Sequence, residues 1–357
     1  MSPIMNAKVL VTAVGGIVAQ GIIKSLKLAN LSDNAVVKYR ITAGDMSAQA
    51  AGLYRCDNGI LLPSATSTDY IESILKIARD EDMDAIYIGS DEELLIIGNS
   101  KKRIESESKA KVLSSPIDVL TTARDKWKTF LFLKENNLPV AESALPADDE
   151  KFVKEFGYPI VVKPREGYGS LYFYLVHCKS EMQQAISNIQ KAGWHALLQE
   201  YLNENNTEYT SGVTIDRFGK YVMSSVSIQK TLKNGQTYKA FIDDYKEVRR
   251  SSEEAALKLG ARGAINIQAK LIENKPKIFE INPRFSATCP MRSVAGINEP
   301  DIVFRNSVLG EEIKVRSYRR LVCMRYWNEV YTDFPTYENL TSTGTLGAND
   351  SFTLNYF

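Results

Sequence analysis

The segment QAKLIENKPKIFEINPR, residues 268–284, decides the fold of this chain. It predicts two short antiparallel strands joined by a turn centred on Asn274. That turn places Gln268 directly across the hairpin from Glu280. Glu280 and Asn282 are two residues apart on one strand, so their side chains point to the same face. The sequence therefore predicts three oxygen-bearing side chains on one face of a β-hairpin.

These three side chains, Gln268, Glu280 and Asn282, are a predicted magnesium site. Carboxylate and amide oxygens are hard ligands, which suit Mg²⁺ and leave other positions for water and phosphate oxygens. Arg284 follows on the same face and can bind a phosphate through two parallel hydrogen bonds. The alternative is an ordinary solvated sheet face, because an isolated Glu-x-Asn is common.

A second motif lies upstream, in Lys163-Pro164-Arg165-Glu166-Gly167-Tyr168-Gly169-Ser170. It directly follows an apolar run, residues 160–162, that is typical of a strand. A lysine followed by a flexible loop offers a cation and backbone N–H groups to the same anion, as polyphosphate binding requires. On these residues alone, a surface turn with an incidental lysine is equally acceptable.

A third stretch joins the two motifs. The apolar run 196–201 contains Glu200 and is followed by Leu202, a polar Asn-rich linker and Glu208. Such a linker can join two lobes with a slot for an adenine ring between them. Its spacing alone favours an exposed acidic linker.

The composition excludes several classes of function. The 357 residues contain 44 Lys and Arg against 43 Asp and Glu, a net charge of +1. No overall field favours nucleic acid or an anionic membrane, so we expect small-molecule partners. Two histidines and four cysteines without a C-x-x-C pair speak against a zinc site and a histidine-based hydrolase. No secretory signal or membrane-length apolar run is evident, so a cytoplasmic location is expected.

The order of elements predicts more than one domain. Strand-like runs alternate with helical ones before Pro116, which is typical of a parallel sheet. After Pro116 an amphipathic helix, residues 126–136, precedes closely spaced strands joined by hairpin-length links, which is typical of antiparallel sheets. The loop 90–93 is expected to contribute to a pocket for the acceptor substrate.

In this order, the lysine, the glycine-rich loop, the acidic linker and the Gln…Glu-x-Asn-Pro-Arg hairpin resemble the ATP-grasp superfamily. The resemblance is greatest to its branch of carbamoyl phosphate synthetase large-subunit-like and PylC-like proteins. It implies an α/β, Rossmann-like parallel-sheet domain followed by an α+β ATP-grasp fold with two antiparallel-sheet lobes. The implied limits are 1–115 for the first domain, 116–202 for the small lobe, 203–315 for the large lobe with the metal site, and 316–357 for an extension of unknown role.

The resemblance also implies roles for individual residues. ATP would be bound by Lys126, Lys163, Arg165, Gly167, Gly169, Ser170, Glu200, Leu202 and Glu208. Lys163 and Arg284 would stabilise the transferring phosphoryl group. Two Mg²⁺ ions are expected, with Mn²⁺ as a substitute. Lys230, Lys239 and Arg292 are candidates for holding a substrate carboxylate.

The expected function is ATP-dependent ligation of a carboxylate to an amine through an acylphosphate, with release of ADP and phosphate. A carboxylase or kinase on the same scaffold and a non-catalytic nucleotide-binding subunit are the alternatives. A nicotinamide-dependent oxidoreductase is disfavoured, because Gly15, Gly16 and Gly21 do not fit G-x-G-x-x-G. A homodimer is left open.

Overall fold

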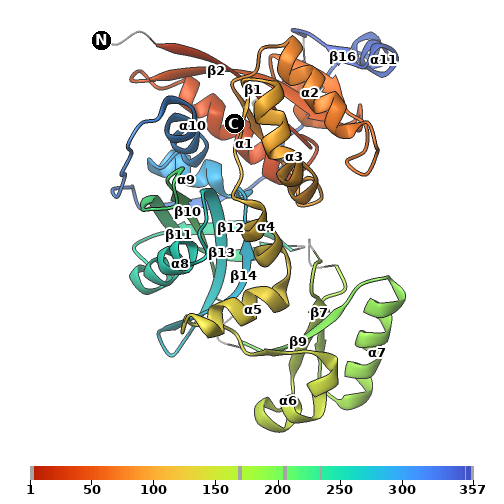
Figure 1. Cartoon of the computed structure of the whole chain (residues 1–357), viewed down its shortest axis with the longest axis vertical. Coiled ribbons are helices and arrows are strands. Elements are labelled where there is room, and N and C mark those ends of the chain that lie inside the picture. Colours follow the sequence, from red (N-terminus) through yellow and green to blue (C-terminus); the bar gives the residue numbers. More distant parts are fainter. Residues whose placement is uncertain (1–3, 168–170, 204–206, 234, 350, 355–357) are drawn as a thin grey trace.

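Three β-sheets organise the molecule (Figure 1). The computed structural model describes residues 4–167, 171–203, 207–233, 235–349 and 351–354. In the view of Figure 1, sheet A lies at the top, sheet B in the middle and sheet C in a small lobe at the bottom. The predicted fold class is confirmed, because a parallel-dominated sheet precedes two antiparallel sheets.

Sheet A has the strand order β16-β3-β2-β1-β4-β5. Five of its strands are parallel, and their long apolar runs reflect burial on both faces. The strands are β1 (Met5–Val11), β2 (Val37–Asp45), β3 (Asn58–Leu61), β4 (Ala85–Tyr87), β5 (Lys111–Val112) and the antiparallel β16 (Thr345–Leu346).

Helices cover both faces of sheet A. Val9 and Leu10 are consecutive in β1, so they point to opposite faces and belong to different apolar clusters. Helix α1 (Ile17–Asn30) packs in the cluster with Val9, while α2 (Tyr70–Asp80) and α3 (Glu93–Glu107) pack in the cluster with Leu10. A short 3-10 helix, η1 (Ala51–Arg55), precedes β3.

Sheet C forms the small lobe, with the strand order β6-β9-β7-β8 and antiparallel pairing throughout. Two helices pack on it and share an apolar core that includes Phe152, Ile160 and Leu198. The elements are β6 (Ser143–Ala144), η2 (Pro146–Asp148), α6 (Asp149–Phe156), β7 (Ile160–Pro164), β8 (Tyr174–Val176), α7 (Lys179–Lys191) and β9 (Ala196–Glu200).

Sheet B is antiparallel, with the strand order β14-β13-β10-β11-β12-β15. Its strands are β10 (Glu208–Ile215), β11 (Val222–Lys233), β12 (Gln236–Ile242), β13 (Gly263–Ile272), β14 (Lys275–Asn282) and β15 (Leu321–Met324). One face packs against α4 (Ile117–Arg124), α5 (Lys126–Glu135) and α8 (Lys246–Lys258). The other face packs against α9 (Cys289–Ala295) and α10 (Glu299–Leu309), which also contact α1.

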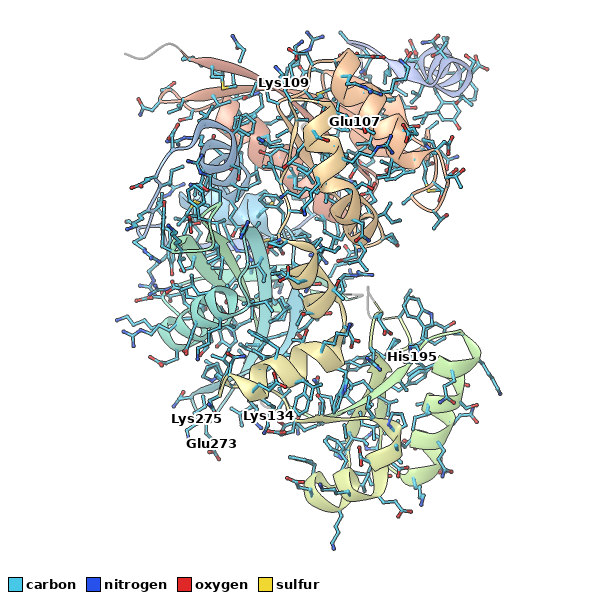
Figure 2. The ribbon with its side chains drawn as sticks, in the orientation of Figure 1. Glu107, Lys109, Lys134, His195, Glu273 and Lys275 are labelled. Atoms are coloured by element: carbon cyan, nitrogen blue, oxygen red, sulfur yellow. The ribbon has the colours of Figure 1, made fainter. Side chains whose placement is uncertain are left out.

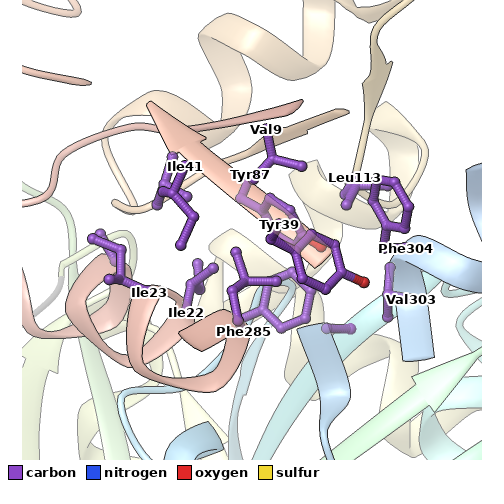
Figure 3. Packing of buried hydrophobic residues seen from close by; sticks show 14 of the residues in the cluster. Val9, Ile22, Ile23, Tyr39, Ile41, Tyr87, Leu113, Phe285, Val303 and Phe304 are labelled. Atoms are coloured by element: carbon purple, nitrogen blue, oxygen red, sulfur yellow. The ribbon is translucent and has the colours of Figure 1, made fainter. Parts of the chain in front are cut away.

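A continuous apolar core joins sheet A to sheet B (Figure 3). Tyr39 meets Phe304 edge to face, with ring centroids 5.1 Å apart, and Tyr87 lies 5.6 Å from Phe285. The hydroxyl of Tyr39 donates to Oδ1 of Asp301 at 2.8 Å. This packing holds the loop after β4 close to the end of β14, where the predicted metal residues lie.

The β13–β14 hairpin has the predicted pairing of Gln268 with Glu280, but a different turn. The turn is formed by Glu273 and Asn274, both with positive φ (49° and 62°), rather than being centred on Asn274. A register shift after Gln268 then brings this residue opposite Glu280, as predicted. Figure 2 shows Glu273 at the outer tip of this hairpin.

The last part of the chain returns to two sheets. Strand β15 pairs with β12 at the edge of sheet B, and β16 pairs with β3 at the edge of sheet A. Helix α11 (Phe334–Thr343) lies between them in the sequence. The domain limits at 115, 202 and 315 stay a prediction. Within the described ranges, no helix is both long and apolar enough to cross a membrane.

Candidate active site

Lys163 lies near the end of β7 with its side chain buried. Its ammonium group donates to Oε1 of Gln199 on β9 at 2.8 Å, and Nε2 of Gln199 donates to the hydroxyl of Ser143 at 3.0 Å. Burial, assisted by the cation of Lys126, lowers the pKa of Lys163 to about 7. Such a lysine takes up a proton when an anion binds beside it.

The predicted phosphate loop begins against the start of α5. Asp125 caps this helix by accepting hydrogen bonds from the backbone N–H groups of Trp127 and Lys128. The same carboxylate accepts a hydrogen bond from Nε of Arg165 at 3.2 Å. The guanidinium of Arg165 is therefore paired with a protein carboxylate.

Lys126 joins this loop to the hairpin. Its Nζ donates to the carbonyl oxygen of Gly167 at 2.8 Å and lies 3.7 Å from Oε1 of Glu280. The predicted residues Gly169 and Ser170 lie outside the described residues. The lysine nevertheless brings the small lobe and sheet B to one place.

Four side chains form a polar chain across sheet B. Nζ of Lys230 lies 2.7 Å from Oε1 of Glu208 and donates to Oε1 of Gln268, also at 2.7 Å. Nε2 of Gln268 donates to Oε2 of Glu280 at 2.6 Å. Lys230 is therefore within the site, and its ammonium group is shared between two predicted ligand-binding residues.

Glu280 stands among four cations. Burial by itself would raise the pKa of this carboxyl, but Lys126, Lys163, Lys230 and Arg284 outweigh burial and hold the pKa below its ordinary value. Glu280 is thus ionised and surrounded by positive charge.

Arg284 reaches from β14 to the N-terminal sheet. Its Nε and Nη2 donate to the two carboxylate oxygens of Asp91, at 3.0 and 2.7 Å. Nη2 also donates to Oδ1 of Asn282 at 3.2 Å. Asp91 belongs to the loop 90–93 between β4 and α3, so the loop expected at the acceptor pocket lies beside the predicted metal residues.

Arg124 is a residue that the sequence analysis missed. It is the last residue of α4, and its Nη1 lies 3.4 Å from Oδ1 of Asp91. The only sequence signal is its position two residues before Lys126. A narrow cavity has Arg124 in its wall together with Asp91, Lys126, Gly167, Glu280 and Asn282.

Glu200 and Leu202, which precede the predicted linker, contact lysines of the β13–β14 hairpin. Both carboxylate oxygens of Glu200 accept hydrogen bonds from Nζ of Lys277 at 2.7 Å, and Oε1 also accepts from the backbone N–H of Glu142 at 2.8 Å. Nζ of Lys270 donates to the carbonyl oxygen of Leu202 at 2.8 Å. The Glu200 side chain is therefore paired rather than exposed.

The prediction for Arg292 is wrong. Its side chain is fully buried, and Nη1 donates to both carboxylate oxygens of Glu299, at 3.2 and 3.1 Å. A guanidinium sealed between α9 and α10 has no surface to offer a substrate. A single sequence carried no indication of this burial.

The prediction for Lys239 is also wrong. Lys239 is opposite Thr231 in the β11–β12 pair, whereas Lys230 is the preceding residue of β11 and points to the other face. Lys239 is exposed on the face of sheet B away from the site. The strand register, which the sequence left undetermined here, decides this.

The described site has a surplus of positive charge. Three carboxylates, of Asp91, Glu208 and Glu280, lie among four cationic side chains, those of Lys126, Lys230, Arg124 and Arg284, and Lys163 adds a fifth positive charge when it is protonated. Among the described residues, no three His, Cys, Asp or Glu side chains cluster as a metal site. One carboxylate and two amides fit Mg²⁺ in donor type, but most of the charge that attracts the ion must come from a ligand such as a polyphosphate.

Comparisons with protein families agree with this geometry. The profile "PylC-like, N-terminal domain" matches residues 17–112, "RimK-like ATP-grasp domain" matches residues 123–231, and "ATP-grasp in the biosynthetic pathway with Ter operon" matches residues 194–330. The chain contains an ATP-grasp domain. The last two profiles together include Lys126, Lys163, Glu280 and Arg284.

Relatives of this chain include the carbamoyl phosphate synthase large chain of Methanocorpusculum labreanum. The two are 26% identical over 266 residues, which is 65% of this chain but only 25% of that protein. The fold resembles N5-carboxyaminoimidazole synthetase from Staphylococcus aureus complexed with ADP, with a TM-score of 0.68, 15% identity and coverage of 96% and 86% of the two chains.

A second solved structure is the biotin carboxylase domain of the Hydrogenobacter thermophilus 2-oxoglutarate carboxylase, in complex with MgADP, ADP and bicarbonate. Its TM-score is 0.68 at 19% identity, covering 94% of this chain and 76% of that chain. At these identities the likeness shows the fold alone.

Proposed function

We propose that the protein is an ATP-dependent ligase that activates a substrate carboxylate as an acylphosphate for attack by an amine. The observation that carries the proposal is the cation cluster around Glu280, which lies between the small lobe and the loop bearing Asp91. A surplus of fixed positive charge in a buried site stabilises a phosphoryl group as its charge spreads in the transition state.

ATP would lie between sheets B and C in this proposal. Lys126 and Lys163 would contact its phosphates, with Arg165, Gly167, Gly169 and Ser170 in the loop that closes over them. Leu202 would border the adenine and Glu208 the ribose. Glu200 would act indirectly, because its carboxylate is bound to Lys277.

Gln268, Glu280 and Asn282 are the residues that would hold Mg²⁺, with two ions proposed and Mn²⁺ as a substitute. The ion would neutralise the phosphate oxygens while ATP is bound. Because Oε1 of Gln268 accepts from Lys230 and Oδ1 of Asn282 accepts from Arg284, both amide groups would have to reorient or share these contacts.

The proposed chemistry has two steps. A carboxylate oxygen of the substrate attacks the γ-phosphorus, and the bond from that phosphorus to the β–γ bridging oxygen breaks, so ADP leaves. The amine nitrogen then attacks the carbonyl carbon, the carbon–oxygen bond to phosphate breaks, and the amine proton passes to solvent or phosphate. No protein nucleophile is required, and Lys163 and Arg284 stabilise the charge on the transferring group.

A carboxylase is a second candidate, because one of the similar folds is a carboxylase domain whose complex contains bicarbonate. Bicarbonate is an oxyacid that the same cationic cluster could bind. The domain limits, a homodimer and a cytoplasmic location belong to the same proposal, with small-molecule carboxylate and amine partners.

The experiment is a screen for ADP and phosphate release with MgATP and pairs of carboxylic acids and amines, with bicarbonate as one acid. We expect release only when both members of a pair are present, with a new C–N bond detected by mass spectrometry. Release with bicarbonate alone would favour the carboxylase. ATP turnover that ignores every acid would contradict the ligase.

A further inference from the structure

Arg124 is a partly buried cation that makes no hydrogen bond among the described residues. Its side chain is 17% exposed, its buried Nε has no partner, and within the described ranges its ionic neighbour is Asp91, at 3.4 Å. Buried guanidinium groups in folded proteins are ordinarily satisfied by hydrogen bonds, because leaving the donors unpaired is costly. The donors of Arg124 are therefore available for an anion.

The position of Arg124 points to a particular anion. It lies beside Arg284, and the carboxylate of Asp91 is held between the two guanidinium groups. This carboxylate marks a place where one carboxylate group binds between two arginines. Asp91 comes from the loop 90–93, on the side of sheet A, whereas the proposed nucleotide contacts come from sheets B and C.

The cations that the sequence predicted for a substrate carboxylate are engaged or absent from the site. Lys230 is shared by Glu208 and Gln268, Arg292 is sealed against Glu299, and Lys239 is on the far face of sheet B. Two nitrogens of Arg284 donate to Asp91. Among the described side chains of the cavity wall, Arg124 thus has the most N–H donors without a hydrogen-bond partner.

We propose that Arg124 and Arg284 form a clamp for the carboxylate that is to be activated, and that Asp91 occupies this clamp when substrate is absent. The proposal rests on the proposed ligase function for the identity of the ligand. Binding of substrate then requires the Asp91 carboxylate to withdraw. Arg124 is a substrate-binding residue that fixes the substrate class as carboxylate or a similarly shaped oxyacid.

One experiment tests the clamp without knowing the natural substrate. Asp91→Ala removes the occupying carboxylate, and acetate is the probe because it has the same end group. Acetate at about 100 mM should raise the melting temperature of D91A by about 1–2 °C over sodium chloride of equal ionic strength. It should leave the double variant D91A/R124Q unchanged. An equal rise in both variants, or no rise in D91A, would overturn the clamp.

A second experiment uses any acid found active in the screen. Arg124→Gln should raise the KM of the acid at least about tenfold, with the KM of MgATP changed less than about twofold. Arg250→Gln, at an exposed arginine of α8, is the matched control and should change neither. A loss of ADP affinity in R124Q equal to its loss of acid affinity would assign Arg124 to the nucleotide instead.

The two experiments separate two failures. If no acid supports ADP release but acetate binds D91A through Arg124, the ligase function fails while the carboxylate clamp stands. Arg124→Lys keeps the charge without the planar fork, and it should recover less than half of the acetate effect in the D91A background. Full recovery would show that a positive charge at this position is enough to bind acetate, and it would contradict a clamp that depends on the planar guanidinium group.

Discussion

Two arginine–carboxylate pairs in the described part of the chain, Arg292–Glu299 and Arg284–Asp91, have opposite charge environments. In the pair Arg292–Glu299, burial outweighs the arginine, so the pKa of Glu299 lies above its ordinary value. In the pair Arg284–Asp91, burial is outweighed by Arg284 and two further cations, so the pKa of Asp91 lies below its ordinary value. Both places pair an arginine with a carboxylate.

The difference separates a structural ion pair from a binding site. The pair Arg292–Glu299 is 0% and 2% exposed, and Nη2 of Arg292 also donates to Asn266, so no further ligand can reach it. The pair Arg284–Asp91 borders a cavity and has more cations than carboxylates around it. An excess of buried positive charge indicates a place that awaits an anion.

The largest expected effect is the loss of turnover in Glu280→Gln. Removing the central carboxylate of the cation-rich cluster should lower MgATP turnover by about 10³-fold or more while the protein stays folded. Glu273→Gln, at the exposed tip of the same hairpin, is the matched control. Steady-state ADP release and circular dichroism provide the measurements. Near-normal turnover in E280Q would remove Glu280 from the site.

The contrast between the two ion pairs fails if replacing Arg292 changes activity rather than stability. Arg292→Met should lower the free energy of unfolding by about 3–5 kcal/mol, because it leaves the Glu299 carboxylate buried without its partner. Urea unfolding measures the change. Arg124→Met, by contrast, should change stability by less than about 1 kcal/mol, since among the described residues it loses one partly exposed ion pair and no hydrogen bond. Equal losses would erase the distinction between the two regions.

Lys163 gives a smaller effect that depends on pH. Its pKa of about 7 should rise when ADP binds, because the phosphates favour the ammonium form. Protonation is then linked to binding, so ADP affinity should weaken as pH rises from about 7.5 to 9, by up to about tenfold per unit. Calorimetric titration of ADP into the wild type and Lys163→Met provides the comparison. The variant should bind weakly with a flat profile, and an unchanged slope would assign the proton to another group.

The smallest effect concerns stability in acid. The difference in the free energy of unfolding between wild type and variant should change with pH in opposite directions for Glu299→Gln and Asp91→Asn. The folded protein holds a proton on Glu299 more tightly than the unfolded chain does. Wild type should therefore gain stability over E299Q as pH falls towards the ordinary glutamate pKa of about 4.3.

Asp91 should behave in the opposite way. Its lowered pKa stabilises the folded state above the ordinary aspartate pKa of about 3.9, and this contribution is lost as pH falls below it. Urea unfolding of both variants between about pH 3 and 7 should give stability differences from wild type that change with pH in opposite directions. Slopes of the same sign would contradict the contrast.

Local patterns were sufficient to predict the core of the candidate site. Alternation along one strand placed Glu280, Asn282 and Arg284 on one face, and a short turn paired Gln268 with Glu280. The predicted turn centre, Asn274, lies half a residue from the true centre between Glu273 and Asn274. A β-bulge offsets this difference, so that Gln268 still pairs with Glu280. Bulges depend on packing between strands, so a single sequence does not reveal them.

Tertiary contacts account for what the sequence could not predict. Arg292 and Arg124 have the same side chain, and only the approach of α10 to one and of the loop 90–93 to the other decides which is sealed. Helix α3 was also missed, because its acidic start was interpreted as part of that loop. The parallel and antiparallel sheets were predicted because they depend on short-range patterning and link length.

The pairing of β16 with β3 has a consequence for synthesis of the chain. Thr345 meets Ile60, so the edge of the first sheet is covered by residues that are synthesised long after β3 itself. Until then the β3 edge is an open template for other strands, and nascent molecules are most exposed to mispairing with one another during that interval.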